Sequence, residues 1–191
     1  EVAAAFLVDL SGSTSRQVER GRRIIDIEKQ GLVLLCEALS AIGDQFAVYG
    51  YSGQGRHLVD FVVVKDFDQL VTGRAGAKRG GMVPLQQNRD GAAIRHATTK
   101  LLARQAKTRL LVMISDGRPL DDGYKDEYSL EDTRMALREA RASGIEPVCI
   151  TIDKQADPYL RRMYGDVRYV VIDRVEGLPE KLPRIYHRLT A

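Results

Sequence analysis

The chain has 191 residues, of which 44% are hydrophobic and 29% are charged, and its formal net charge is +3. This length fits one domain whose hydrophobic core is large enough to fold without disulfides. The sequence contains no transmembrane-length apolar run, and its nearly balanced charge, without Trp, argues against nucleic-acid binding.

The first third of the chain alternates between strand and helix patterns. Residues 3–9 are continuously apolar, as in a central strand that is buried on both faces. Apolar side chains recur at helical spacing over residues 24–42, and Gly43 ends that helix. Residues 46–51 and 57–65 are predicted strands, and the short loop between them makes them an antiparallel hairpin at a sheet edge.

The rest of the chain continues this alternation. We expect a short helix over 66–71, a long glycine-rich loop over 73–90 and a helix over 91–105. Then come a strand over 108–115, a polar loop over 116–128 and a helix over 129–142, which the capping box Ser129-Leu-Glu-Asp132 opens. The chain ends with a strand over 145–152, a short helix over 156–164, a strand over 167–172 and a closing helix over 177–189.

This order of elements predicts an α/β fold with three layers. The sheet would be open, six-stranded, mostly parallel and Rossmann-like, with one antiparallel edge strand and helices on both faces. We interpret residues 1–191 as a single domain. The chain starts inside a predicted strand and without an initiator Met, so we expect it to be part of a longer protein.

The loop after the first strand carries a possible metal site. Asp9 offers a carboxylate, Ser11 and Ser13 can aim hydroxyls at the same point, and Gly12 lets the backbone bend closely. A serine cluster that caps a helix is the alternative interpretation of the same residues. Oxygen ligands without thiolate or imidazole favour Mg²⁺, with Mn²⁺ or Ca²⁺ as competitors.

Two further loops are expected at the same edge of the sheet. Asp116 follows the strand 108–115, and Asn88 and Asp90 precede the helix 91–105. Ligands of open parallel sheets bind at the carboxyl ends of the strands, where the strand order reverses. We therefore expect Asp116 to orient metal-bound water, and Asn88 or Asp90 to complete the site.

Asp9-x-Ser11-x-Ser13 and Ile114-Ser-Asp-Gly117, each directly after a buried strand, resemble the metal-ion-dependent adhesion site (MIDAS) of the von Willebrand factor A (VWA) domain. The resemblance covers nearly the whole chain. A finer similarity, to the C-terminal A domain of bacterial NorD and CbbO proteins, is carried by Asp9-Leu-Ser, Lys65-Asp-Phe-Asp68, Gly91-Ala-Ala-Ile-Arg-His-Ala97, Glu131-Asp-Thr-Arg134, Leu178-Pro-Glu-Lys-Leu-Pro183 and Tyr186.

The resemblance implies a Mg²⁺ site that recognises an Asp or Glu on a protein partner. It also implies partnership with a MoxR-type AAA+ ATPase, and a target enzyme such as nitric oxide reductase for NorD or Rubisco for CbbO. The chain would then be the C-terminal domain of an adaptor. Where the family has a Thr ligand this sequence has Asn88, and Asp90 is the alternative ligand there.

The main alternative is an enzyme, a Mg²⁺-dependent phosphotransferase or hydrolase with Asp9 as the nucleophile. That reaction needs a general acid beside Asp9, and Ser11 is a poor one. The three histidines are isolated and form no catalytic or zinc arrangement, so we expect no enzyme. A third alternative is a structural domain whose metal site is filled by another segment of the same protein.

Three further features leave their roles open. The acidic residues Asp121, Asp122, Asp126 and Glu127 form either a solvated loop or a rim that faces a partner. The basic residues Arg16, Arg20, Arg22 and Arg23 are either solvated or steer an acidic partner. Cys36 and Cys149 lie in apolar runs, which predicts buried free thiols in a reducing compartment, and we expect a cytoplasmic protein.

Overall fold

In the part of the chain that the structure describes, six strands pair into one sheet that has the first strand near its centre. The computed structural model describes residues 1–69, 82–117, 119, 121–124, 126–152 and 157–191. The strand order is β3-β2-β1-β4-β5-β6, and only β2 and β3 pair antiparallel. The strands are β1 (Val2–Asp9), β2 (Gln45–Gly53), β3 (Val59–Lys65), β4 (Thr108–Ser115), β5 (Glu146–Thr151) and β6 (Arg168–Val171).

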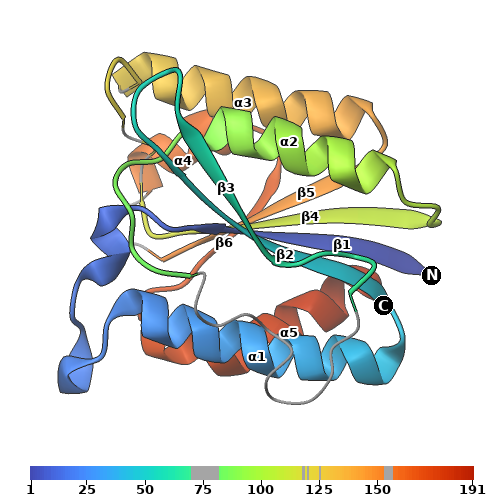
Figure 1. Ribbon diagram of the computed structural model, residues 1–191. Coiled ribbons are helices and arrows are strands. Elements are labelled where there is room, and N and C mark those ends of the chain that lie inside the picture. Colours follow the sequence, from blue (N-terminus) through green and yellow to red (C-terminus); the bar gives the residue numbers. More distant parts are fainter. Residues whose placement is uncertain (70–81, 118, 120, 125, 153–156) are drawn as a thin grey trace.

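Helices cover both faces of this sheet. In Figure 1, α1 and α5 lie below the sheet, and α2, α3 and α4 lie above it. The helices are α1 (Ile24–Ile42), α2 (Asp90–Leu102), α3 (Asp126–Ala142), α4 (Asp157–Tyr164) and α5 (Leu178–Thr190). Short 3₁₀ turns occur at η1 (Gly12–Ser15), η2 (Glu19–Gly21) and η4 (Val175–Gly177).

Two apolar cores follow from the alternation of side chains along β1. Phe6 and Val8 point into the core between the sheet and helices α1 and α5, whereas Ala5 and Leu7 point into the core between the sheet and helices α2, α3 and α4. Every residue of β1 is buried. A strand covered on both faces needs apolar side chains at every position, which is why residues 3–9 lack the polar alternation of a half-exposed strand.

The strand order places a topological switch point beside β1. The chain leaves β1 for β2 on one side, and later crosses to β4 on the other side. The loops that follow β1 and β4 therefore diverge at the carboxyl edge of the sheet and leave room between them. The predicted three-layer fold, with six strands and an antiparallel edge strand, is confirmed.

Two local predictions differ from the structure. The helix expected over 66–71 is a turn at residues 66–69, and its last two residues lie outside the described part of the chain. The capping box at Ser129 is wrong, because α3 begins at Asp126. The Ser129 hydroxyl donates to the Asp126 carbonyl at 3.0 Å, as a residue inside the first turn does. Of the loop expected over 73–90, residues 73–81 are not described.

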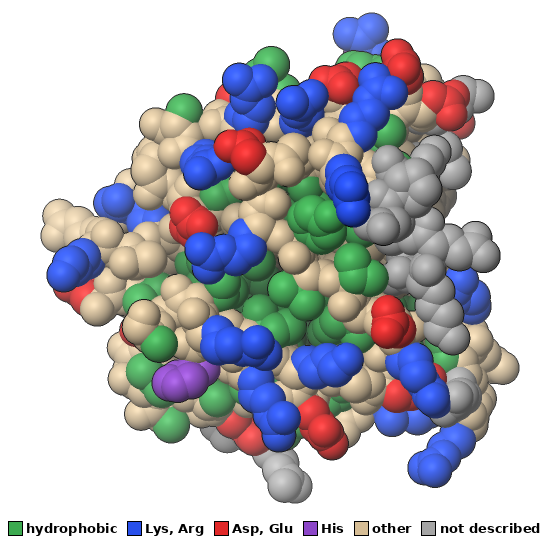
Figure 2. Space-filling model, turned by 180° about the vertical axis from the view of Figure 1, so that it is seen from behind, with side chains coloured by type: hydrophobic (Ala, Val, Ile, Leu, Met, Phe, Trp, Pro, Cys, Tyr) green, Lys and Arg blue, Asp and Glu red, His purple; other side chains and the backbone are tan. Residues whose placement is uncertain are grey.

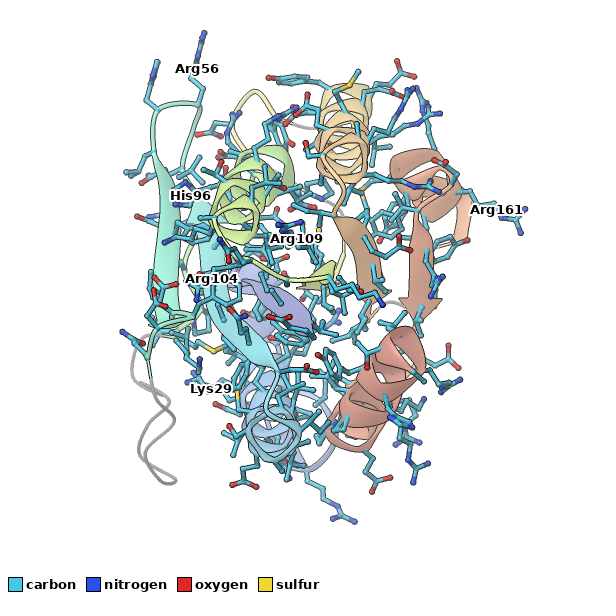
Figure 3. The ribbon with its side chains drawn as sticks, turned by 90° about the vertical axis from the view of Figure 1, so that its right-hand side faces the viewer. Lys29, Arg56, His96, Arg104, Arg109 and Arg161 are labelled. Atoms are coloured by element: carbon cyan, nitrogen blue, oxygen red, sulfur yellow. The ribbon has the colours of Figure 1, made fainter. Side chains whose placement is uncertain are left out.

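Charged side chains are dispersed over the surface. Figure 2 shows Lys and Arg interspersed with Asp and Glu on one face of the molecule. In Figure 3, Arg104 and Arg109 lie at the amino edge of the sheet, opposite the switch-point loops, and Arg161 points outward from α4. No helix among the described residues is long and apolar enough to cross a membrane.

The buried central strand makes a first prediction. Leu7→Ala should lower the free energy of unfolding by about 2–5 kcal/mol, because it leaves a cavity under α2 and α3. Leu34→Ala, on the exposed side of α1, is the matched control and should cost less than about 1 kcal/mol. Urea denaturation followed by circular dichroism measures both, and equal losses would contradict the assigned core.

Candidate functional site

A chain of hydrogen bonds joins the loops after β1 and β4. The Ser11 amide donates to Asp9 Oδ1 at 2.7 Å. The Ser11 and Ser13 hydroxyls are 2.9 Å apart, and the Ser13 hydroxyl donates to Asp116 Oδ1 at 2.8 Å. These four predicted site residues are therefore brought together by contacts that span the switch point.

Asp9 lies at the centre of this arrangement. Its Oδ2 accepts hydrogen bonds from the Asn88 amide at 2.8 Å and from the Ser115 hydroxyl at 3.2 Å. Burial, and then the charge of Asp116, raise the pKa of Asp9 to about 7, although the bonds from Ser11 and Ser115 oppose the shift. The two acids thus repel each other unless a cation or a proton lies between them.

Asn88 and Asp90 occupy different environments. Asn88 lines the open cavity beside Ser11 and Ser13, and its amide reaches Asp9. Asp90 is fully buried at the start of α2, and its Oδ1 accepts a hydrogen bond from the Tyr51 hydroxyl at 2.9 Å. Its Oδ2 has no hydrogen-bond partner in the described part of the chain, and burial raises the pKa of this carboxyl well above its usual range.

The backbone around Gly12 explains how the serines reach the site. The Gly12 amide donates to the Gln86 carbonyl at 2.8 Å, and the Leu85 amide donates to the Leu10 carbonyl at 2.7 Å. A Cβ on Gly12 would lie 3.3 Å from the Gln86 oxygen, so glycine allows this close approach. The turn η1 then directs Ser13 toward Asp116.

The polar groups face an open cavity of about 220 Å³. Polar residue types predominate among the residues that line it, which are Ser11, Ser13, Gln86, Gln87, Asn88, Asp116 and Gly117. Hydroxyl, amide and carboxylate oxygens are the ligands that Mg²⁺ and Ca²⁺ prefer. No cluster of three His, Cys, Asp or Glu side chains able to hold a metal occurs in the described residues, so a cation here would need the serine hydroxyls.

A buried ion pair that the sequence did not reveal holds the Asn88 loop. Arg89 Nε donates to Asp121 Oδ2 at 2.5 Å, and the two side chains are only 8% and 0% exposed. Arg89 also donates to the Asp122 carbonyl and lies over the Tyr124 ring, 4.7 Å from its centroid. Asp121 Oδ1 accepts the Gly55 amide, so the pair joins the β2–β3 hairpin, the Asn88 loop and the loop after β4.

This pair corrects the interpretation of the acidic segment. Asp121 belongs neither to a solvated loop nor to an exposed rim, because its carboxylate is buried against Arg89. Glu127 is exposed and pairs with Arg162 on α4. Residue type alone could not distinguish the buried Asp121 from the exposed Glu127, because only the fold brings Arg89 beside the loop after β4.

The basic residues before α1 make local contacts. Arg23 pairs with Asp26 at 2.8 Å, and Arg22 donates to the Gln30 side chain at 2.6 Å. Both contacts are on the exposed surface. Whether this segment steers an acidic partner stays a prediction.

A further carboxyl, Glu28 of α1, is buried close to the site. Among the residues that the structure describes, neither of its oxygens has a hydrogen-bond partner. Burial raises the pKa of Glu28 well above its usual range, and the charges of Asp116 and Asp9 add to the shift. The sequence analysis did not single out this residue, because its helical position predicts only a side chain that faces the sheet.

The ion pair makes a second prediction. Arg89→Met should lower the free energy of unfolding by about 3–5 kcal/mol, because Asp121 is left charged and buried. Arg141→Met breaks the exposed pair with Asp166 and should cost less than about 1 kcal/mol. Chemical denaturation of both variants tests this, and similar losses would mean that the Arg89 pair has no special role.

Glu28 makes a third prediction, on pH dependence in EDTA. The folded protein keeps this carboxyl protonated at pH values where the unfolded chain, with an ordinary pKa of 4.5, has lost the proton. Its stabilising effect is therefore complete below pH 4.5 and is lost as the pH rises toward the folded-state pKa. Relative to Glu28→Gln, the wild type should lose up to about 1.4 kcal/mol of unfolding free energy per pH unit between pH 4.5 and the folded-state pKa. Urea denaturation at pH 5, 6 and 7 measures this, and parallel profiles would contradict it.

Comparison with known proteins gives the context of this site. Residues 5–176 match the family model of the von Willebrand factor type A domain. An uncharacterized protein of Pseudomonas aeruginosa is 43% identical over 190 residues, which are 99% of this chain and 31% of that protein. Protein NorD of Brucella melitensis is 35% identical, over 99% of this chain and 30% of its own length.

A solved structure shares the fold at low sequence identity. The vWF domain of the type V pili tip protein Mfa5 from Porphyromonas gingivalis superposes with a TM-score of 0.62 at 9% identity, over 100% of this chain and 96% of that structure. The chain spans about a third of the length of the curated relatives that it matches.

Proposed function

The chain belongs to the von Willebrand factor type A family, and on this basis we propose that it is a protein-binding adaptor domain with a magnesium-dependent adhesion site. The site would recognise an Asp or Glu side chain on a protein partner. The observation that carries the proposal is the hydrogen-bonded set of Asp9, Ser11, Ser13 and Asp116 around an open cavity at the switch point.

The donor set and the buried charge support a divalent cation. Asp9 and Asp116 are both buried, and the charge of Asp116 opposes ionisation of Asp9. The nearby cation Arg89 is committed to Asp121. Buried charges in proteins are paired or bind metals. A cation that is bound between oxygen ligands would relieve this repulsion.

Each residue would then have a definite task. Asp9 would hold the cation by a carboxylate oxygen, and the Ser11 and Ser13 hydroxyls would supply further oxygen ligands. Asp116 accepts hydrogen bonds from water at the site, and Asn88 offers an amide oxygen from the third loop. Mg²⁺, when bound, supplies positive charge and open coordination positions for a carboxylate of the partner.

Binding is favoured over catalysis by the surroundings of Asp9. Its oxygens are occupied by Ser11, Asn88 and Ser115, none of which is an effective general acid. A phosphotransferase with Asp9 as the nucleophile would need such an acid. We therefore propose that the chain is not an enzyme.

The similarity to NorD extends the proposal to partners. We propose that the full-length protein works with a MoxR-type AAA+ ATPase to activate or remodel a target enzyme, nitric oxide reductase if it acts like NorD or Rubisco if it acts like CbbO. In this arrangement the VWA domain would recognise the target and the ATPase would supply the force. Mn²⁺ or Ca²⁺ could replace Mg²⁺ in the same oxygen site.

A capture experiment makes the fourth prediction. The immobilised wild-type chain should retain a specific protein from the native cytosol with Mg²⁺ and lose it with EDTA, and Asp9→Ala should lose it in both buffers. Asp60→Ala, on the exposed edge strand β3, is the matched control and should behave as the wild type. Equal capture by the wild type and by Asp9→Ala, with Mg²⁺ and with EDTA alike, would contradict the proposed site.

The alternatives give different outcomes. Hydrolysis of phosphate esters by the wild type but not by Asp9→Ala would favour the enzyme. A cation site that is filled by another segment of the same protein would bind that segment in isothermal titration and capture no separate partner.

A further inference from the structure

Glu28 occupies an unusual position for a carboxyl group. It lies in the second turn of α1, on the face that packs against the sheet, and its side chain is fully buried. The residues that share this face, such as Ile25 and Leu32, belong to the apolar core. Neither Glu28 oxygen accepts or donates a hydrogen bond within the described chain.

Such a group costs folding free energy unless something compensates it. An apolar side chain at position 28 would fill the core without that cost. The basic residues at the start of the same helix do not compensate Glu28, because Arg23 pairs with Asp26 and Arg22 with Gln30. The helix therefore keeps a carboxyl group where the core alone does not need one.

The charged groups that act on Glu28 relate it to the candidate metal centre. The charged groups that act on it are Asp116 and Asp9, the two acids of the candidate metal centre. They come from the ends of β4 and β1, and α1 contacts the serine turn η1 directly. Glu28 thus lies on the helix that contacts the serine turn of the centre, and the cavity at this turn is lined by Ser11 and Ser13.

We propose that Glu28 is a positioning residue of the metal centre, which contributes a third carboxylate from outside the direct ligand set. This inference rests on the proposed function. With a divalent cation bound, the Glu28 carboxylate would accept hydrogen bonds from hydroxyl or water hydrogens at the centre, and its charge would strengthen cation binding. Without a cation, it stays neutral in the core.

This role has a consequence that a structural role lacks. Removing the carboxylate weakens cation binding, as loss of an outer-shell partner typically does, by about 10- to 100-fold. Replacing it with an apolar side chain also stabilises the metal-free protein, because an unpartnered buried carboxyl is removed. Opposite effects on metal affinity and on metal-free stability therefore identify a residue kept for the metal centre.

The test uses Mn²⁺ as a spectroscopic probe, because free and bound Mn²⁺ are distinguished by electron paramagnetic resonance. The wild type, Glu28→Gln, Glu28→Leu and Asp9→Ala are titrated with Mn²⁺, and competition with Mg²⁺ checks that the probe occupies the magnesium site. Glu37→Gln is the matched control, because Glu37 lies on the same helix and is exposed. Thermal unfolding in EDTA measures the stability of each variant.

We expect Asp9→Ala to abolish Mn²⁺ binding, both Glu28 variants to bind about 10- to 100-fold more weakly, and Glu37→Gln to match the wild type. Glu28→Leu should also melt a few degrees higher than the wild type in EDTA. Glu28 variants that bind like Glu37→Gln, while Asp9→Ala does not bind, would overturn the inference and leave the proposed function intact. A wild type that binds no Mn²⁺ would overturn both.

Discussion

The burial of several like charges at one edge of the sheet is the constraint on which the rest of this structure depends. Asp9 and Asp116 lie at the carboxyl ends of β1 and β4, Asp90 begins α2 and Glu28 lies in α1, and each of the four is at most 9% exposed. A domain of this size has a net stability of about 5–15 kcal/mol, so each unpaired buried charge would remove a large part of that stability. Protons or a bound cation must therefore neutralise these buried carboxylates.

The surrounding loops hold this cluster in place by separate devices. The β1–α1 loop is bonded through Gly12 and Leu10 to the segment that carries Asn88. The Arg89–Asp121 pair joins that segment to the loop after β4 and to the β2–β3 hairpin. The three loops are thus tied to each other outside the cluster, so under the proposed function the loops would keep their positions when a cation replaces the hydrogen bonds among the side chains.

The sequence predicts the fold well because its signals are local and strong. The apolar run 3–9, the helical spacing over 24–42 and the short hairpin loop each have one physical interpretation, and together they imply a layered α/β sheet with an antiparallel hairpin at its edge. The predicted cluster of Asp9, Ser11, Ser13 and Asp116 lies at strand ends, which parallel topology must bring together. In contrast, Arg89, Asp121 and Glu28 acquire their roles only from tertiary packing, and no spacing in the sequence indicates an ion pair across 32 residues.

The charge balance also bears on how a partner could be recognised. If Asp9 and Asp116 are the ionised acids around a bound divalent cation, the centre is neutral overall and attracts a partner carboxylate mainly through open coordination positions. If Glu28 is ionised as well, the centre is negative and repels that carboxylate, although it holds the cation more firmly. Tight cation binding and tight partner binding then oppose each other. Protonation of Glu28 would weaken cation binding and favour binding of the partner carboxylate, and ionisation of Glu28 would do the reverse. A shift of α1 relative to the serine turn η1, which it contacts, would change that balance without any change in the direct ligands.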